Sequence, residues 1–317
     1  MQIEIAIALV LVGFFLLIWS ADVLVDNASE LAGNMGISTF LVGIIIVGFG
    51  TSAPELFVSA MASLEGKGNL ALGNALGSNI TNIGMVLGCA VIVRRLPVER
   101  STACRDIPIV LLTGVLAIGL IIDGILSIFD GLILLGVLVS YLVWSSRSQN
   151  NSSTEVTDQE ANSRPQKSTA VYAAWTIFSI VLLMLASKML VNGAVTIAEF
   201  FGVGELIIGL TIVAIGTSLP ELAAAIAAAR KGVHDMIIGN IIGSNVFNTL
   251  GVLGLTGALK TTQIDTSALW RDFPVMFAFT LFIFIIAMYK GHLGRPHGAT
   301  LLAGYLGYIG YLIFVSV

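Results

Sequence analysis

The segment Gly48-Phe49-Gly50-Thr51-Ser52-Ala53-Pro54-Glu55-Leu56 places a glutamate in the middle of a long apolar stretch. A near copy, Ala214-Ile215-Gly216-Thr217-Ser218-Leu219-Pro220-Glu221-Leu222, follows 166 residues later. A carboxylate at membrane depth is costly, and by default it indicates a transport or ion-binding residue. Two such glutamates in duplicated surroundings predict one site that is shared by two related halves.

The composition is that of a membrane protein that crosses the bilayer many times. Of 317 residues, 56% are hydrophobic and only 11% are charged, and the mean hydropathy is +0.97. A soluble domain contains about 25% charged residues. Membrane lipid is therefore the expected environment, while nothing in the sequence predicts nucleic-acid binding or an obligatory protein partner. Cys89 and Cys104 have no metal-type spacing and imply no disulfide framework.

A membrane-spanning helix needs about 20 mainly apolar residues. The sequence predicts an all-α fold with ten such spans, at 4–25, 37–64, 70–93, 106–122, 126–145, 171–195, 204–229, 236–259, 272–289 and 299–316. A polar segment at 146–170 has the composition of a flexible linker. The predicted organisation is a first five-helix repeat at 1–147, a linker at 148–169 and a second five-helix repeat at 170–317.

The two halves keep the 166-residue offset over most of their length. Gly73-Asn74 matches Gly239-Asn240, and Gly77-Ser78-Asn79 matches Gly243-Ser244-Asn245. This register indicates internal duplication. Because five spans is an odd number, the second half must enter the membrane from the opposite side, as an inverted repeat.

The distribution of basic residues predicts the orientation. With the N-terminus outside, the cytoplasmic loops contain eleven Lys and Arg residues, and the outer loops contain three: Lys67, Lys260 and Arg271. The excess of positive charge in cytoplasmic loops therefore predicts that both termini are outside and the linker is cytoplasmic.

The glutamate motif predicts a broken helix. Pro54 has no N–H group, so the carbonyl of Gly50 loses its helical partner. Thr51 and Ser52 precede Glu55 by four and three residues and share a helix face with it. Irregular backbone at membrane depth is tolerated only where it faces protein or a watery cavity. Thr217, Ser218, Pro220 and Glu221 repeat the arrangement.

A second polar pattern follows each motif. Asn74, Ser78 and Asn82 are four residues apart on one helix face, and the second half repeats them as Asn240, Ser244 and Asn248. These side chains are candidates for ion binding, but both the Asn and the Ser residues are also suited to bonding neighbouring helices. All the candidate ligands are oxygen atoms, which suit Ca²⁺ and Na⁺ and disfavour Zn²⁺ or copper. The carboxylates could instead take up protons.

Two charged residues occupy equivalent positions in the first and sixth spans, Asp22 and Lys188. They could form a charge pair, act as gate elements, or extend their charged ends to the membrane interface.

On these motifs the chain resembles the cation/Ca²⁺ exchanger superfamily, and most of all its prokaryotic sodium/calcium exchanger branch. The likeness covers both halves. It implies ten helices, of which the first and sixth slide across a core formed by four helices of the repeats. It also implies a Ca²⁺ site at Glu55 and Glu221 with the backbone carbonyls of Thr51 and Thr217. The implied Na⁺ ligands are the side chains of Ser52, Ser78, Ser218 and Ser244, the carbonyls of Gly48 and Ala214, and the amides of Asn82 and Asn248.

One position departs from the pattern of the resembling family. Many sodium/calcium exchangers have an acidic residue where this chain has Asn248, and Gly48 replaces a common Ala. The implied site therefore has one carboxylate fewer, which bears on the ion stoichiometry and on the identity of the driving ion.

The sequence thus predicts a secondary antiporter that exchanges Ca²⁺ for Na⁺ by alternating access in the plasma (inner) membrane, with inorganic cations as cargo and no cofactor. Exchange of Ca²⁺ for H⁺ at the same glutamates is the first alternative. A passive cation channel is a second, but a channel needs a continuous pore, which an inverted repeat around one carboxylate pair does not favour. An enzyme is not expected, since no nucleophile–base set or His-based metal motif is present.

Overall fold

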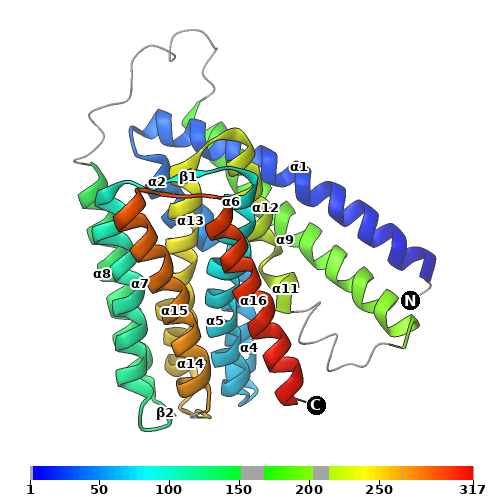
Figure 1. The fold of residues 1–317 in the computed structure, drawn as a ribbon. Helices are drawn as coiled ribbons and strands as arrows, with labels where there is room; N and C mark the ends of the chain where they lie inside the picture. Colours follow the sequence, from blue (N-terminus) through cyan, green and yellow to red (C-terminus); the bar gives the residue numbers. More distant parts are fainter. Residues whose placement is uncertain (1–2, 151–167, 203–213, 266, 317) are drawn as a thin grey trace.

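The computed structural model describes residues 3–150, 168–202, 214–265 and 267–316. These residues are nearly all helical (Figure 1). Within these described ranges, eight helices are long and apolar enough to cross a membrane, or nine if the bent segment Thr39–Leu64 counts as one span. The first half of the predicted span 204–229 and most of the predicted linker lie outside the described residues.

The bounds of the helices agree with the predicted spans to within a few residues at most ends. The first half contains α1 (Ile3–Met35), α2 (Thr39–Val42), η1 (Gly43–Gly48), α3 (Phe49–Thr51), α4 (Ala53–Leu64), α5 (Gly68–Thr81), η2 (Asn82–Leu87), α6 (Gly88–Val93), α7 (Arg100–Ile121) and α8 (Ile128–Asn150). The second half contains α9 (Thr169–Phe200), α11 (Ala214–Thr217), α12 (Leu219–Lys231), α13 (His234–Val246), η5 (Phe247–Val252), α14 (Leu253–Leu259), α15 (Ser267–Lys290) and α16 (Arg295–Ser316).

Two long helices lie side by side and cross the rest of the bundle obliquely (Figure 1). They are α1, with 33 residues, and α9, with 32, so each extends beyond its predicted span. Gly13 of α1 faces the backbone of Ala186 and Leu190, while Gly193 of α9 faces the backbone of Ala6 and Val10. The two helices are therefore antiparallel, and glycine on each side permits the close approach.

The remaining helices form a bundle whose centre contains π-helical turns. In the part of the chain that the structure describes, three segments, η1, η2 and η5, are π-helical. Such turns are rare and are frequent at functional sites. The sequence did not predict them. In addition, the segment Thr39–Leu64 bends by 44° where α3 ends and α4 begins, at the break that Pro54 predicts.

Two short antiparallel strand pairs join loops of the two halves at opposite ends of the bundle (Figure 1). β1 (Leu96–Pro97) pairs with β4 (His292–Leu293), and β2 (Ile125–Leu126) pairs with β3 (Thr262–Gln263). The loops after the third and ninth predicted spans thus meet at one end. Those after the fourth and eighth meet at the other.

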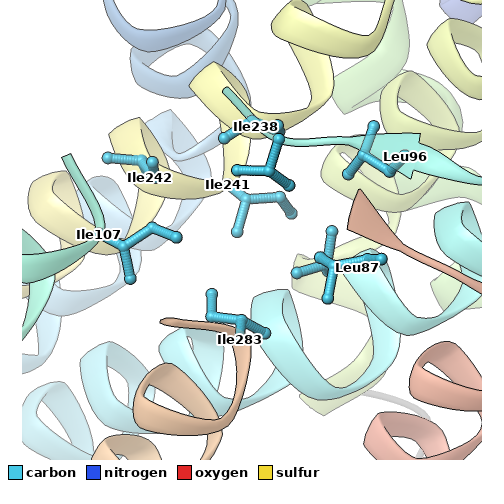
Figure 2. A pocket seen from close by; sticks show the side chains of 9 residues that line it. Leu87, Leu96, Ile107, Ile238, Ile241, Ile242 and Ile283 are labelled. Carbon is cyan, nitrogen blue, oxygen red and sulfur yellow. The ribbon is translucent and has the colours of Figure 1, made fainter. Parts of the chain in front are cut away.

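Aliphatic side chains fill the bundle at the end of the β1–β4 pair. A cavity of about 20 Å³ is lined there only by apolar residues of the two halves, among them Leu87, Leu96, Ile107, Ile238, Ile241, Ile242 and Ile283 (Figure 2). An apolar cavity of this size stays dry. This part of the protein therefore offers no polar route for an ion.

Positive-φ glycines recur at the 166-residue offset. Gly66 and Gly232 both have φ of +78°, and each follows the helix that begins beside a motif glutamate. Gly36 and Gly202, with φ of +65° and +77°, terminate the two long helices. A residue with a Cβ atom is strained in this conformation, so glycine ends the helices at the same places in both halves.

Candidate functional site

The two motif glutamates are buried at the centre of the bundle. Glu55 and Glu221 lie in the first turns of α4 and α12, each directly after a proline. Their exposed fractions are 0% and 1%, and they are near enough for their charges to interact. The structure therefore brings together the two carboxylates that lie 166 residues apart in the sequence.

The backbone at both breaks has the same shape. Ser52 has φ −83° and ψ 2°, and Ser218 has φ −92° and ψ 8°. At this point the helix stops and a new one begins, so the serine no longer follows the face of its own helix. The Ser52 hydroxyl donates to Oε1 of Glu221, at 3.3 Å. The sequence predicted that Ser52 shares a helix face with Glu55. In the structure its hydroxyl instead bonds the glutamate of the other half, because the helix is interrupted at this residue.

Helix α13 supplies a polar group beside the first motif. The Oδ1 atom of Asn240 accepts from the hydroxyls of Thr51 and Ser244, both at 3.5 Å. The hydroxyl of Ser244 also lies 3.4 Å from the backbone carbonyl oxygen of Gly48. Gly239 and Gly243 permit this approach, because a Cβ atom at either position would overlap the backbone of Phe40 or Ile44.

Several buried oxygen atoms around the glutamates have no hydrogen-bond partner. They are both carboxylate oxygens of Glu55, Oε2 of Glu221, Oγ of Ser218, and Oδ1 of Asn82 and of Asn248. Native proteins pair nearly all buried polar atoms, so such a group requires an explanation. Asn82 and Asn248 lie in the first turns of the π-helices η2 and η5. A bound cation would satisfy oxygens of this kind.

The remaining residues that the sequence predicted as ligands lie on α5 and α11, the helical segments next to those already described. Ser78 is buried on α5, Thr217 is half-buried at the end of α11, and Ala214 is the first residue of α11. Asn74 and Asn79 form hydrogen bonds to neighbouring helices, which is the structural alternative to ion binding that the sequence left open. Asn74 donates to the Glu55 carbonyl and to Ser59, and Asn79 donates to Thr249 at 2.8 Å.

The second motif has a contact that the sequence analysis missed. The hydroxyl of Ser187, on α9, donates to the carbonyl oxygen of Gly216 at 2.7 Å. The helical donor to that carbonyl would be residue 220, which is proline, so Ser187 replaces a bond that proline removes. The repeat offset could not reveal it, because the equivalent residue in the first half is Ala21.

The number of acidic groups is small. Within the described part of the chain, no cluster of three or more His, Cys, Asp or Glu side chains could hold a metal ion. The candidate site contains two carboxylates, and its other groups are hydroxyls, amides and backbone carbonyls. Neutral oxygens with one or two carboxylates suit hard cations such as Ca²⁺, whereas they do not suit metals that prefer nitrogen or sulfur.

The apolar spans and the paired buried glutamates define an ion-transporting, multi-pass membrane protein. The family model of the sodium/calcium exchanger protein matches residues 5–147 and 171–314. The chain belongs to this family, whose members exchange cations across membranes, and it is a cation/Ca²⁺ exchanger of the prokaryotic branch. A family of transporters is consistent with the expectation that the chain is not an enzyme.

Its relatives cover almost the whole chain. CaxA of Alkalimonas amylolytica is 42% identical over 98% of this chain and 99% of its own length. The inner membrane protein YrbG of Escherichia coli is 38% identical over 98% of both chains. The solved structure of the sodium-calcium exchanger NCX_Mj, soaked with Na⁺ and Sr²⁺, has a TM-score of 0.85 at 29% identity and covers 98% of this chain and 99% of its own. The predicted recognition of the family is confirmed.

Proposed function

We propose that the protein is an antiporter that exchanges Ca²⁺ for Na⁺ by alternating access and expels Ca²⁺ with the inward Na⁺ gradient. The observation that supports this most directly is the pair of buried glutamates, one from each half, amid oxygen atoms that lack partners. No basic side chain forms an ion pair with either glutamate among the described residues. Two buried negative charges are costly unless a cation compensates them.

The proposed Ca²⁺ ligands are the carboxylates of Glu55 and Glu221 and the carbonyls of Thr51 and Thr217. Flanking Na⁺ positions would use Ser52, Ser78, Ser218 and Ser244, the carbonyls of Gly48 and Ala214, and the amides of Asn82 and Asn248. The hydrogen bond from Ser52 to Glu221 and the contact between Ser244 and the Gly48 carbonyl support this grouping. Na⁺ and Ca²⁺ would compete because both need the same carboxylates.

The proposed architecture is ten spans in two inverted repeats, with both termini outside. Three observations support it: α1 and α9 are antiparallel, positive-φ glycines recur at the repeat offset, and each strand pair joins loops that are predicted to lie on one side of the membrane. Inverted repeats supply two near-equivalent arrangements, each open to one side. The plasma (inner) membrane is the proposed location, in keeping with the name of the relative YrbG.

The absence of an acid at position 248 leads to a proposal about stoichiometry. Two carboxylates are neutralised by one Ca²⁺ or by two Na⁺, and a third Na⁺ would leave an uncompensated charge, which is expensive to bury. We therefore expect electroneutral exchange of two Na⁺ per Ca²⁺, or a third Na⁺ that binds weakly. Flux measured at clamped membrane voltage tests this: strongly voltage-dependent exchange with three tightly coupled Na⁺ would refute the charge argument.

Exchange of Ca²⁺ for protons is the competing proposal, since two buried carboxylates close together can also take up protons. The deciding experiment is uptake of radiolabelled Ca²⁺ into proteoliposomes under an imposed Na⁺ gradient or an imposed pH gradient. We expect Na⁺ to drive uptake and the pH gradient alone to leave it near background. Uptake that follows only the pH gradient would overturn the choice of Na⁺. Uptake without any gradient dependence would support a channel.

A further inference from the structure

An ion pair joins the end of a core helix to one of the long helices. Lys231, the last residue of α12, places its Nζ atom 2.6 Å from Oδ1 of Asp26 and 2.7 Å from the carbonyl oxygen of Asp22. Both acidic residues belong to α1. Since α12 begins beside Glu221, this contact connects the helix of the candidate cation site to a helix that the resemblance identifies as sliding.

The repeat offset gives this contact a counterpart in which the residue at the end of the core helix has the opposite charge. Glu65 is equivalent to Lys231, Lys188 to Asp22, and Asn192 to Asp26. In one half the Lys231 ammonium at the end of the core helix meets the Asp26 carboxylate and the backbone carbonyl of residue 22. In the other half the Glu65 carboxylate at the end of α4 has the side-chain amide of Asn192 and the ammonium of Lys188 at the equivalent positions of α9. The backbone agrees, because Gly66 and Gly232, the next residues, both have φ of +78°.

Only one of the two contacts is formed in this structure. Glu65 binds Lys67 instead, at 2.7 Å, and both side chains are exposed. Lys188 is exposed and forms no ion pair with another described residue. The packing has the same asymmetry: α1 packs along α12, while α9 makes no comparable contact with α4 among the described residues.

We propose that these two sets of residues are alternating latches, each of which holds one end of the transporter closed. The proposal rests on the proposed alternating-access function. When inverted repeats exchange their conformations, α9 packs on α4 as α1 now packs on α12. This movement brings Lys188 and Asn192 to the Glu65 carboxylate and separates Lys231 from α1. In the proposed orientation the Lys231 latch closes the cytoplasmic end, and the Glu65 latch closes the outer end.

The latches position the helices and do not touch the transported ions. Exposed ion pairs contribute little, so we expect each latch to shift the ratio of the two states by a few-fold, on the order of twofold to fivefold. A shift of this size biases the cycle without trapping it.

The test is disulfide cross-linking in the full-length protein in liposomes, with Cys89 and Cys104 replaced by Ser. The pair Lys231→Cys with Asp26→Cys reports the state of this structure, and the pair Glu65→Cys with Lys188→Cys reports the opposite one. We expect both pairs to cross-link, and we expect changes in ion gradient that increase one yield to decrease the other. If the Glu65–Lys188 pair never cross-links while the Lys231–Asp26 pair does, the proposal is wrong.

Charge reversal tests the electrostatic part. In the background of the Glu65–Lys188 cysteine pair, Lys231→Glu should raise the cross-linking yield, and the further change Asp26→Lys should lower it again. Arg230→Glu is the matched control, because this neighbouring side chain forms no ion pair with a described residue of α1, and it should leave the yield unchanged. Equal effects of Lys231→Glu and Arg230→Glu would refute the latch.

Measurement of Ca²⁺ exchange by the unmodified protein distinguishes a failure of the latch from a failure of the proposed Ca²⁺/Na⁺ exchange. If the protein exchanges Ca²⁺ for Na⁺ but the cross-links do not alternate, the latch fails and the proposed function stands. If neither Na⁺ nor protons drive Ca²⁺ uptake although the cross-links alternate, the proposed ions are wrong and the latch stands.

Discussion

The two copies of the glutamate motif share their sequence pattern but not their surroundings. The first copy lies against α13, where Asn240 and Ser244 contact Thr51 and the Gly48 carbonyl. The second copy is contacted by α9, whose Ser187 bonds the Gly216 carbonyl, and the equivalent residue in α1 is Ala21. A duplicated sequence therefore specifies two similar half-sites, and the helices packed on them make the halves unequal in any one state.

The long helix α9 touches both breaks. A Cβ atom at Gly50 would lie 2.5 Å from Cδ1 of Ile180, and one at Gly216 would lie 2.3 Å from Cγ2 of Val191. An apolar groove between α9 and the segment 45–53 accompanies the first of these contacts. The contact at Gly50 is apolar, whereas the one at Gly216 includes a hydrogen bond. In the proposed movement of α9 along these contacts, the apolar contact can slide, whereas the hydrogen bond from Ser187 must break.

The largest expected effect tests whether the halves share one site. Glu55→Gln or Glu221→Gln should each reduce Ca²⁺ exchange to the level of empty liposomes, because removal of either carboxylate leaves a divalent cation uncompensated. Exchange by proteoliposomes is the measurement, with membrane insertion checked by size-exclusion chromatography. Glu99→Gln is the control, since this glutamate is exposed and lies outside both the proposed site and the two latches, and it should retain exchange. Normal exchange by a well-folded Glu55→Gln protein would disprove the shared site.

The next test concerns Asn248, where many members of the family have an acidic residue. Asn248→Asp adds a third carboxylate near two others, and a unit charge about 4 Å away is worth roughly 4 kcal/mol at an effective dielectric constant of about 20. We expect at least about a tenfold stronger competition by Na⁺, or a new dependence on pH if the added acid holds a proton. Titration of Na⁺ against Ca²⁺ at several pH values measures both.

The equivalent change, Asn82→Asp, extends this test to the first half. A similar response at both positions would mean that the two half-sites face the ions alike. If Asn248→Asp leaves the Na⁺ and pH dependence unchanged, position 248 does not face the ions and the proposed ligand is incorrect.

The contact between the halves is expected to be sensitive to a single methyl group. In Gly239→Ala the new Cβ atom would lie 2.3 Å from the backbone oxygen of Phe40, so the helices must separate. Overpacking of this kind costs about 1–3 kcal/mol. Gly136→Ala is the control, because this exposed residue of α8 has nothing within 4 Å of the added atom. Thermal unfolding in detergent should show a lower midpoint for Gly239→Ala alone.

A smaller effect is expected from Ser187. Its hydrogen bond is available only while α9 lies beside Gly216, and Ala21 offers no equivalent in the opposite state. A net hydrogen bond is worth about 0.5–1.5 kcal/mol, so Ser187→Ala should shift the ratio of states by roughly twofold to thirteenfold. The cysteine cross-links described above report this ratio. Ser187→Thr keeps the hydroxyl and should keep the ratio, and equal behaviour of the two variants would exclude the bond as the cause.

The smallest expected effect concerns Lys67, which has no basic counterpart in the second half, where Val233 is equivalent. The hydrogen bond from Lys67 lowers the pKa of Glu65 and occupies its carboxylate. Lys67→Val should free Glu65 for Lys188 and raise the population of the opposite state slightly, by about twofold. The effect should disappear when Glu65 is replaced by Gln. An effect that persists in that double variant would indicate another cause.

The sequence by itself was sufficient for the membrane class, the family and most helix positions, and it predicts the internal duplication. These follow from local properties: about 20 apolar residues make a span, a proline breaks a helix, and a fixed offset reveals a repeat. The two glutamates were also identifiable, because a carboxylate in an apolar segment is unusual wherever the segment lies. The structure shows both the predicted break, at Ser52, and the predicted closeness of the two carboxylates.

Only the tertiary structure decided which half of the protein each side chain contacts, and which of two equivalent contacts is formed. Ser52 bonds the glutamate of the other half, and Ser187 of α9 bonds the Gly216 carbonyl that lacks its helical donor. Lys231 forms an ion pair with α1, whereas Glu65 forms none with α9. The π-helical turns at Asn82 and Phe247 were likewise absent from the prediction. A sequence repeat specifies contacts that both halves can make, but two neighbouring helices cannot occupy both arrangements at once, so packing selects one and leaves the other unmade.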